Sequence, residues 1–323
     1  MSLQPYHPKP QPAVVSTPTL DDLPDPPPDK AGWPWTEQGD LLPKTRSHGT
    51  PWPKISIVTP SYNQGDFIEE TIRSVLLQRY SNLEYIVMDG GSDDETVEIL
   101  EKYDPWIDYW VSEPDDGQSD AINKGFERAS GDIFAWLNSD DYYAPNAVAT
   151  MARSFSSVED EVGALVGTGH KINESGEVVF TPDRSELTHE AFLNWMDGNE
   201  FMQPACFFHR KAWEKCGPLR TDLRYPMDVD LWLKISDRYR FQRISQAIAY
   251  AYKHTGAKTV AERHRMRAEI ILLLKDHGAG EAARREVMKM ADELYALQSM
   301  NQKMNRHPIF KWAMRVWRYL FNR

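Results

Sequence analysis

Short apolar runs alternate with amphipathic segments over the first half of the chain. The runs at 55–58, 85–88, 109–111 and 133–137 are dominated by apolar residues and predict buried strands. The segments between them, beginning near residue 68 and covering 96–103 and 119–129, carry apolar residues at helical spacing. Strands that alternate with helices predict a parallel sheet with right-handed crossovers. The expected fold class is therefore α/β, with a mostly parallel sheet flanked by helices.

The pattern differs on both sides of this region. Residues 1–52 show little apolar periodicity and are rich in proline, so we expect an extended arm. The Trp33-Pro34-Trp35 cluster of this arm is expected to dock on the main domain, which we take as 53–260. Within that domain, 173–176 predicts a hairpin turn and 227–240 predicts a helix. Residues 261–323 are rich in charge and predict a helical extension.

Composition excludes several classes of protein. Hydrophobic residues make up 41% and charged residues 26%, which is typical of a globular chain. The net charge of −11 repels nucleic acid, so no nucleic-acid partner is expected. Cys206 and Cys216 lack metal-site spacing and predict reduced thiols in or near a core. Because there is no leader pattern and no apolar run of membrane-spanning length, we expect a cytoplasmic protein.

Polar residues follow each predicted strand, at 59–63, 89–93, 112–117 and 138–141. Ligands bind beyond the carboxyl ends of parallel strands. Acids gathered there repel one another unless a cation lies among them, and carboxylate oxygen favours Mg²⁺ or Mn²⁺. The natural counter-anion of such a cation is a nucleoside diphosphate.

The acids at these strand ends do not all point to a metal. Asp140 and Asp141 directly follow a fully apolar strand, so we favour metal binding for both. Asp93, Asp94 and Asp116 fit helix caps and turns equally well. The sequence contains no Walker motif and no Gly-x-Ser-x-Gly elbow, so phosphate recognition is expected to rest on a metal and on the backbone.

Three segments together resemble the family 2 glycosyltransferases, which are inverting enzymes of the GT-A fold. They are 55–63 (ISIVTPSYN), 88–93 (MDGGSD) and 136–141 (WLNSDD), in the family's order. The resemblance covers about residues 53–258. It implies transfer of a sugar from a nucleotide-sugar donor, with a UDP-sugar favoured, to a saccharide or lipid-linked acceptor. It also implies a role in polysaccharide or glycolipid assembly for the cell envelope.

The resemblance assigns roles to individual residues. The implied donor-binding residues are Thr59, Pro60, Tyr62, Asn63, Asp89, Asp120, Asn123, Asn138 and Ser139. Among them, Asp89 matches the acid that hydrogen-bonds the base. The segment Asn138-Ser139-Asp140 matches the family's Asp-x-Asp metal motif, with Asp140 as its second acid. Asn138 replaces the first Asp, which removes one negative charge from the implied metal site.

Two later segments complete the implied site. Asp228 matches the catalytic base, although Met227 replaces the Glu that usually precedes it. Asp230 is the rival for that role, and its alternative is a salt-bridging acid. A further segment resembles a loop with a histidine near the diphosphate, so His254 is a third candidate metal ligand. A structural role for this histidine stays open.

The end of the chain is basic and amphipathic. Residues 308–323 place basic side chains on one helical face and apolar and aromatic ones on a neighbouring face. This pattern favours contact with an anionic membrane surface, here the inner face of the plasma membrane, over docking on protein.

Two other functions remain open from the sequence. A sugar-phosphate nucleotidyltransferase is disfavoured, because the loop at 62–65 lacks the basic residue that such enzymes usually carry there. A non-catalytic carbohydrate-binding or scaffold protein derived from a transferase is kept open by the changes at Asn138 and Met227. The sequence makes no prediction of the oligomeric state.

Overall fold

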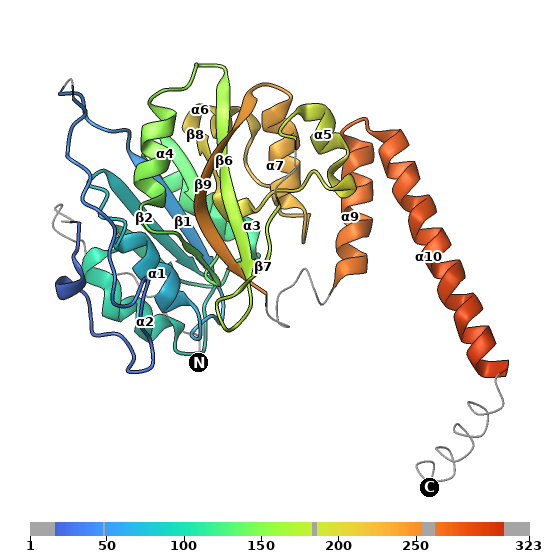
Figure 1. Cartoon of the computed structure of the whole chain (residues 1–323), viewed down its shortest axis with the longest axis horizontal. Coiled ribbons are helices and arrows are strands. Elements are labelled where there is room, and N and C mark those ends of the chain that lie inside the picture. Colours follow the sequence, from blue (N-terminus) through green and yellow to red (C-terminus); the bar gives the residue numbers. More distant parts are fainter. Residues whose placement is uncertain (1–16, 48, 183–185, 254–261, 307–323) are drawn as a thin grey trace, which may run out of the picture. The chain divides into compact units, whose positions relative to one another are not determined.

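The computed structural model describes residues 17–47, 49–182, 186–253 and 262–306 (Figure 1). Contacts within the chain divide it into two compact units, Met1–Glu269 and Ile270–Arg323, with the division inside helix α9. The first unit contains every β-strand of the described residues.

The first unit is built on a mixed sheet, whose described strands follow the order β3-β2-β1-β4-β8-β6-β9-β5, with β7 beside β6. Four adjacent strands are parallel: β1 (Ile55–Ser61), β2 (Leu83–Asp89), β3 (Tyr109–Ser112) and β4 (Ile133–Trp136). They alternate along the chain with α1 (Ile68–Leu76), α2 (Thr96–Tyr103) and α3 (Gln118–Arg128). The parallel α/β arrangement predicted for this half of the domain is confirmed.

The second half of the sheet mixes strand directions. Its strands are β5 (Asp141–Tyr143), β6 (Val162–Ile172), β7 (Val178–Phe180), β8 (Cys206–His209) and β9 (Arg240–Tyr252). Its helices are α4 (Ala147–Phe155), α5 (His189–Leu193), α6 (Arg210–Cys216) and α7 (Met227–Ser236). The hairpin predicted around 173–176 joins β6 to β7. The helix predicted over 227–240 is shorter than expected, because Arg240 already pairs with β6 as the first residue of β9.

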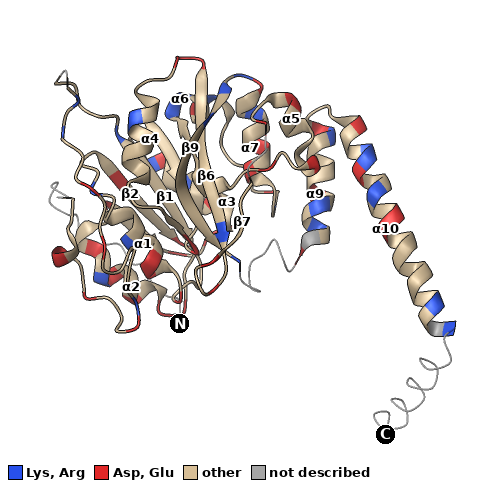
Figure 2. Cartoon of the chain, viewed as in Figure 1, with Lys and Arg blue, Asp and Glu red and all other residues tan. Residues whose placement is uncertain are grey.

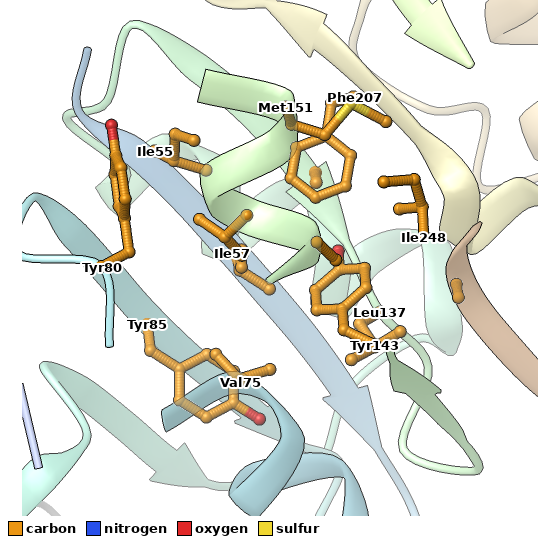
Figure 3. Packing of buried hydrophobic residues seen from close by; sticks show 14 of the residues in the cluster. Ile55, Ile57, Val75, Tyr80, Tyr85, Leu137, Tyr143, Met151, Phe207 and Ile248 are labelled. Carbon is orange, nitrogen blue, oxygen red and sulfur yellow. The ribbon is translucent and has the colours of Figure 1, made fainter. Parts of the chain in front are cut away.

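Apolar side chains cover both faces of the sheet. On one face, Ile57 of β1 lies in a buried cluster with Val75 of α1 and Met151 of α4 (Figure 3). On the other face, α3 approaches β1 so closely that a Cβ on Gly125 would lie 2.4 Å from Cγ1 of Val58. The close approach explains why a glycine stands in the middle of α3. A glycine at such a position lowers helix stability by about 1 kcal/mol relative to alanine. Helices on both faces bury every residue of β1.

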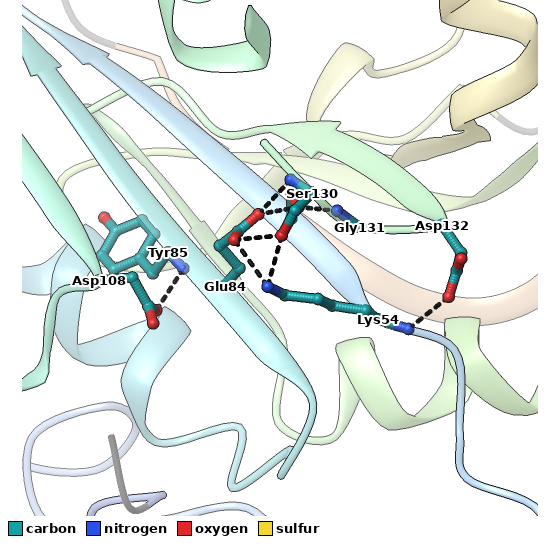
Figure 4. Close-up of polar contacts among 8 residues, drawn as sticks. Lys54, Glu84, Tyr85, Asp108, Ser130, Gly131 and Asp132 are labelled. Atoms are coloured by element: carbon teal, nitrogen blue, oxygen red, sulfur yellow. Dashed lines mark hydrogen bonds and ion pairs between the residues drawn. The ribbon is translucent and has the colours of Figure 1, made fainter. Parts of the chain in front are cut away.

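A polar network fixes the amino ends of the parallel strands. Nζ of Lys54 lies 2.7 Å from Oε1 of Glu84 on β2, and the hydroxyls of Ser56 and Ser130 donate to the same carboxylate (Figure 4). Burial alone would raise the pKa of Glu84, but these bonds hold it below its usual value. The backbone N–H of Lys54 also donates to Asp132, just before β4. The network joins three strands and so helps to align their opposite ends.

The N-terminal arm docks on this unit through its tryptophans, as the sequence predicts. Nε1 of Trp33 donates to the carbonyl of Tyr143 at 2.7 Å, and the Trp35 side chain is buried. Arg73 of α1 is fully buried beneath the arm, and its guanidinium lies 5.4 Å from the ring centre of Trp35. The guanidinium donates to three arm carbonyls, those of Pro24, Pro34 and Trp35.

The second unit is helical over its described residues. Helix α9 (Arg263–Asp276) leads into it, and α10 (Gly280–Arg306) is 27 residues long. None of the helices in the described part of the chain has the length and apolar character needed to span a membrane. The basic amphipathic segment predicted at 308–323 lies outside the described residues.

Candidate active site

The parallel strands end together at one edge of the sheet. Ser61 of β1 pairs with Asp89 of β2, and Asp89 pairs with Ser112 of β3. Leu137, directly after β4, donates its backbone N–H to the carbonyl of Val58. The polar segments that follow the strands therefore lie along one edge, where ligands bind in parallel α/β sheets.

Asp89 is the centre of a hydrogen-bond cluster at this edge. Its buried carboxylate accepts bonds from the hydroxyls of Ser92 and Ser112, each at 2.5 Å. It also accepts the backbone N–H groups of Gly91 and Ser92. These bonds hold the carboxylate in one orientation. Three of these four bonds go to Oδ2 and one goes to Oδ1, so Oδ1 is the oxygen with room to accept a further donor from a ligand.

The loop after β1 is tied to the loop after β2. Asn63 has a left-handed backbone with φ of 52°, and its N–H donates to the hydroxyl of Ser92. The side-chain oxygen of Asn63 accepts the N–H of Asp93. Asp94 accepts the N–H groups of Gly65 and Thr96, which is the capping role that the sequence left open for it. The two loops therefore form one rigid wall of the edge.

The other donor-binding candidates of this loop differ in exposure. Tyr62 is exposed, whereas Pro60 is buried. Thr59 is fully buried, and its hydroxyl accepts a bond from the hydroxyl of Tyr85 at 3.1 Å. Tyr62 therefore presents its ring to solvent, and Thr59 supports the strand from inside.

Charged residues gather where α3 begins beside β2 and β3. Oδ2 of Asp120 lies 2.8 Å from Nζ of Lys124. Burial first, and then the negative charges of Asp120 and Asp89, raise the pKa of Asp115. Glu113, Asp115 and Lys124 line a small recess of about 10 Å³ beside Asp89. The recess has room for no more than about one water molecule, and its acids give this part of the edge a surface rich in hydrogen-bond acceptors.

Asn123 makes a different contact. Its amide donates to the carbonyl of Leu219 and accepts the N–H of Leu219, both at 2.9 Å. The side chain predicted to contact a donor therefore ties α3 to the segment that precedes α7.

Asn138 joins three elements at the end of β4. Its Oδ1 accepts a bond from Nε2 of Gln118, the first residue of α3, at 2.8 Å. Its Nδ2 donates to Oδ2 of Asp141 at 3.1 Å and lies 3.5 Å from Oε1 of Gln203. Nε2 of Gln203 donates to the carbonyl of Trp136. Neither glutamine is among the predicted site residues, although Gln118 opens the helix that follows the third strand and this position was a signal for it.

Asp140 and Asp141 differ in burial. Asp141 begins β5 and is buried, whereas Asp140 is half-buried. Burial, and then the negative charge of Asp140, raise the pKa of Asp141 well above its ordinary value. The repulsion between these adjacent carboxyl groups is the electrostatic condition that a cation relieves.

Two further residues, Ser139 and His254, are predicted to lie near the cation. Ser139 is buried, and its carbonyl accepts a bond from the hydroxyl of Thr71. His254 lies outside the described residues. Within the part of the chain that the structure describes, no three acid, histidine or cysteine side chains form a metal-binding group by themselves.

Asp228 lies in the first turn of α7 and is half-buried. Its carboxylate accepts the N–H of Val229 at 2.8 Å, and desolvation raises its pKa to about 6. Burial, followed by the charge of Asp228, raises the pKa of the Cys206 thiol. Cys206 follows the turn that carries Gln203, which contacts Asn138. The field of Asp228 therefore reaches the start of β8, which follows the turn in contact with Asn138.

Asp230, the rival of Asp228, makes an ion pair. Its side chain is buried, and Oδ2 lies 2.6 Å from Nζ of Lys234 one helical turn away. This is the salt-bridging alternative stated from the sequence.

Comparison with known sequences agrees with this arrangement. Residues 56–216, from β1 to the end of α6, match the family described as Glycosyl transferase family 2. The chain belongs to this family. The match covers the strand ends around Asp89 and Asn138 and stops before Asp228.

Curated relatives of this family 2 glycosyltransferase match part of its length. An uncharacterized glycosyltransferase of Mycobacterium tuberculosis is 41% identical over 118 residues, which cover 36% of the chain and 45% of that protein. The hyaluronan synthase of Pasteurella multocida is 28% identical over 211 residues, which cover 64% of the chain and 21% of the synthase. The matches thus span less than half the length of both relatives.

Solved structures confirm the predicted GT-A fold. TarS 1-349 of S. aureus, in complex with UDP-GlcNAc, has a TM-score of 0.55 at 20% identity, covering 68% of this chain and 65% of that one. The mannosyltransferase PcManGT of Pyrobaculum calidifontis, in complex with GDP-Man and Mn²⁺, has a TM-score of 0.51 at 17% identity, covering 88% of both chains. At these identities the likeness concerns the fold alone.

Proposed function

We propose that this family 2 glycosyltransferase transfers a sugar from a nucleoside-diphosphate donor to an acceptor hydroxyl, with inversion at the anomeric carbon. The proposal rests on the burial and the raised pKa of the Asp228 carboxyl group. It is a half-buried carboxyl group in the first turn of α7, and desolvation raises its pKa to about 6. A general base works best when its pKa lies near the operating pH, and perturbed carboxyl groups are common at catalytic sites.

The donor base is assigned to the end of β2. Asp89 is held in one orientation by two hydroxyls and two backbone N–H groups, and the recess beside it is acidic. A uracil ring offers one N–H to such an acceptor, which fits the UDP-sugar favoured from the sequence. Tyr62 and Asn63 would border the nucleoside, and Asp120 and Asn138 would contact the rest of the donor. Neighbours solved with UDP-GlcNAc and with GDP-Man support a nucleotide-sugar donor.

Asp140 is proposed to hold a divalent cation together with the donor diphosphate. Mg²⁺ is commonly held by one or two carboxylates plus substrate phosphates, so a site without a full protein cage is sufficient. The repulsion between Asp140 and Asp141 fits such a cation, and PcManGT was solved with Mn²⁺. When bound, the cation would stabilise the charge that gathers on the departing diphosphate. Asp141 and His254 remain the further candidate ligands.

Asp228 is proposed to take the proton of the acceptor hydroxyl as that oxygen attacks the sugar. Attack from the face opposite the diphosphate inverts the anomeric carbon in one displacement. The acceptor is proposed to be a saccharide or a lipid-linked saccharide of polysaccharide or glycolipid assembly, which the likeness to a hyaluronan synthase supports. The family match favours neither a nucleotidyltransferase nor a non-catalytic scaffold.

The test compares Asp228→Asn with Asp230→Asn, which remove one carboxylate each from the same helix. Hydrolysis of UDP-, GDP-, dTDP- and CMP-sugars is measured with Mn²⁺ and with EDTA. We expect Asp228→Asn to lower kcat by about 10²- to 10⁴-fold with nucleotide binding intact, since this is the usual contribution of a general base. Asp230→Asn should reduce thermal stability, through its lost ion pair, more than kcat. Retention of most activity in Asp228→Asn would exclude it as the base, and a wild-type chain inactive with every donor would refute the transferase.

A further inference from the structure

Helix α10 carries exposed apolar side chains along most of its length. Its first turns contain buried residues, among them Ala283 and Glu286. From Val287 onward most apolar side chains are exposed, with 57% of Leu294 and 56% of Leu297 accessible to solvent, while Met290 is half-buried. A helix of 27 residues normally draws its stability from burial of an apolar face. Such a face, left open over several turns, marks a surface that binds a partner.

The spacing of these residues identifies the kind of partner. Six positions follow one another in alternating steps of three and four: Val287, Met290, Leu294, Leu297, Asn301 and Met304. This spacing places all six in one narrow stripe, which we call the seam. A stripe with a mean period of 3.5 residues is the signature of a two-stranded coiled coil. We propose that the seam pairs with the same seam of a second copy of this chain, in a parallel, in-register dimer.

Asn301 selects the parallel arrangement. In a parallel, in-register pair the two Asn301 side chains lie opposite each other, where their amides can bond across the seam. In an antiparallel pair aligned on the same stripe, each Asn301 would instead lie opposite an apolar residue near Met290. A polar residue at one such position is the usual device that fixes register and orientation.

Charge also favours a second copy over a membrane surface. The residues of α10 outside the seam include acids as well as bases, such as Asp292, Glu293, Lys289 and Lys303. An anionic membrane surface prefers a predominantly basic polar face. In the parallel pair Glu293 flanks the seam opposite Gln298 of the second copy, so no like charges meet there. Figure 2 shows that the stretch of α10 before its basic end is nearly free of charge.

The length of the seam limits the expected affinity of the dimer. From Val287 to Met304 it extends about 25 Å at 1.5 Å per residue. Two helices paired over so short a length form a small interface, near or below the roughly 1,200 Å² at which the range of specific interfaces starts. The dimer is therefore reversible, with a dissociation constant on the order of micromolar.

The test uses sedimentation equilibrium of the full chain from 1 to about 200 µM, a range that brackets a micromolar constant. The wild type should approach twice the monomer mass of 37.3 kDa as concentration rises. Leu294→Glu/Leu297→Glu should stay monomeric. Met288→Glu/Tyr295→Glu is the matched control: it adds the same charge to the same helix, at exposed apolar residues away from the seam, and should still dimerise. A wild type that is monomeric at the highest concentration, or two double variants that behave alike, would refute the proposal.

A second measurement tests orientation. Under mild oxidation Asn301→Cys should form a covalent dimer, because a parallel pair brings the two thiols together, while Tyr295→Cys should not. Circular dichroism confirms that both variants stay folded. The native Cys206 and Cys216 are buried, so they do not compete in this reaction. Equal cross-linking of the two variants, or of neither, would overturn the parallel seam.

Discussion

Replacement of Arg73 by methionine should release the N-terminal arm and destabilise the first unit. Methionine keeps the apolar stem but removes a guanidinium that is fully buried between the arm and α1. That group donates to the carbonyls of Pro24, Pro34 and Trp35 at 2.8–3.1 Å and to the hydroxyl of Tyr103 at 2.9 Å. The variant leaves these acceptors without their charged donor.

The magnitude follows from the number and burial of these bonds. A hydrogen bond to a charged group contributes about 1.5–3 kcal/mol, and neighbouring bonds that share one donor group are not additive. A buried acceptor left without its donor costs about 1–3 kcal/mol. We expect a loss in this range for Arg73→Met. The stability of Arg73→Lys should lie between those of the wild type and Arg73→Met. An ammonium group keeps the charge but cannot reproduce the planar fork of guanidinium donors.

Urea unfolding and limited proteolysis measure the two consequences. The free energy of unfolding should fall by the amount above, and protease should cleave the arm before the rest of the chain. Lys102→Met is the control, since the Lys102 side chain is 39% exposed and makes one ion pair, with Glu69, so its loss should cost less than that of Arg73. An Arg73→Met chain that unfolds within 1 kcal/mol of the wild type, with its arm still protected, would refute the reasoning.

Three other changes probe the site and its support. Because Asp228 must be deprotonated to act as a base and its pKa is about 6, kcat/KM should rise as pH increases through 6 and then level off; a profile flat from pH 5 to 8 would contradict this. Gly125→Ala should lower the free energy of unfolding by about 1–3 kcal/mol through its clash with Val58, and Val58→Ala in the same chain should recover part of it, as measured by urea unfolding. Asn138→Asp should lower the melting temperature in EDTA, because it places a carboxylate against Asp141, and Mn²⁺ should restore it; an unchanged melting temperature in EDTA would count against this contact.

The sequence predicts the first half of the sheet, because each of its elements has a recognisable pattern of apolar residues. Strands β1 to β4 are short apolar runs, and the helices between them carry a clear apolar stripe, so each can be identified from its own residues. Strand β9 was missed because Arg240–Tyr252 mixes polar and apolar residues without strict alternation. Its pairing with β6 and β5 depends on partners distant in sequence. The predicted helix ran into this strand for the same reason.

The candidate site was predictable in outline but not in its contacts. Parallel topology alone places the ends of β1, β2 and β3 together, and the structure confirms this at Asp89. The contact of Asn138 with Gln203 spans 65 residues, and the bonds of Asn123 to Leu219 span 96. Local sequence carries no signal for such distant pairs. The sequence therefore predicts which residues lie at the edge of the sheet. Which of them bond to other parts of the protein depends on the tertiary fold.

The amide at Asn138 changes how this edge can be ordered before a cation binds. An ionised aspartate only accepts hydrogen bonds, whereas an amide accepts from Gln118 and donates to Asp141 at the same time. An aspartate at this position would add a third charge beside Asp140 and Asp141, and the edge would then depend on a cation for its order. With Asn138 the same elements are joined through a neutral amide. For the cation proposed above, this would mean a weaker protein site that needs more ligands from the diphosphate, so we expect cation and donor to bind together.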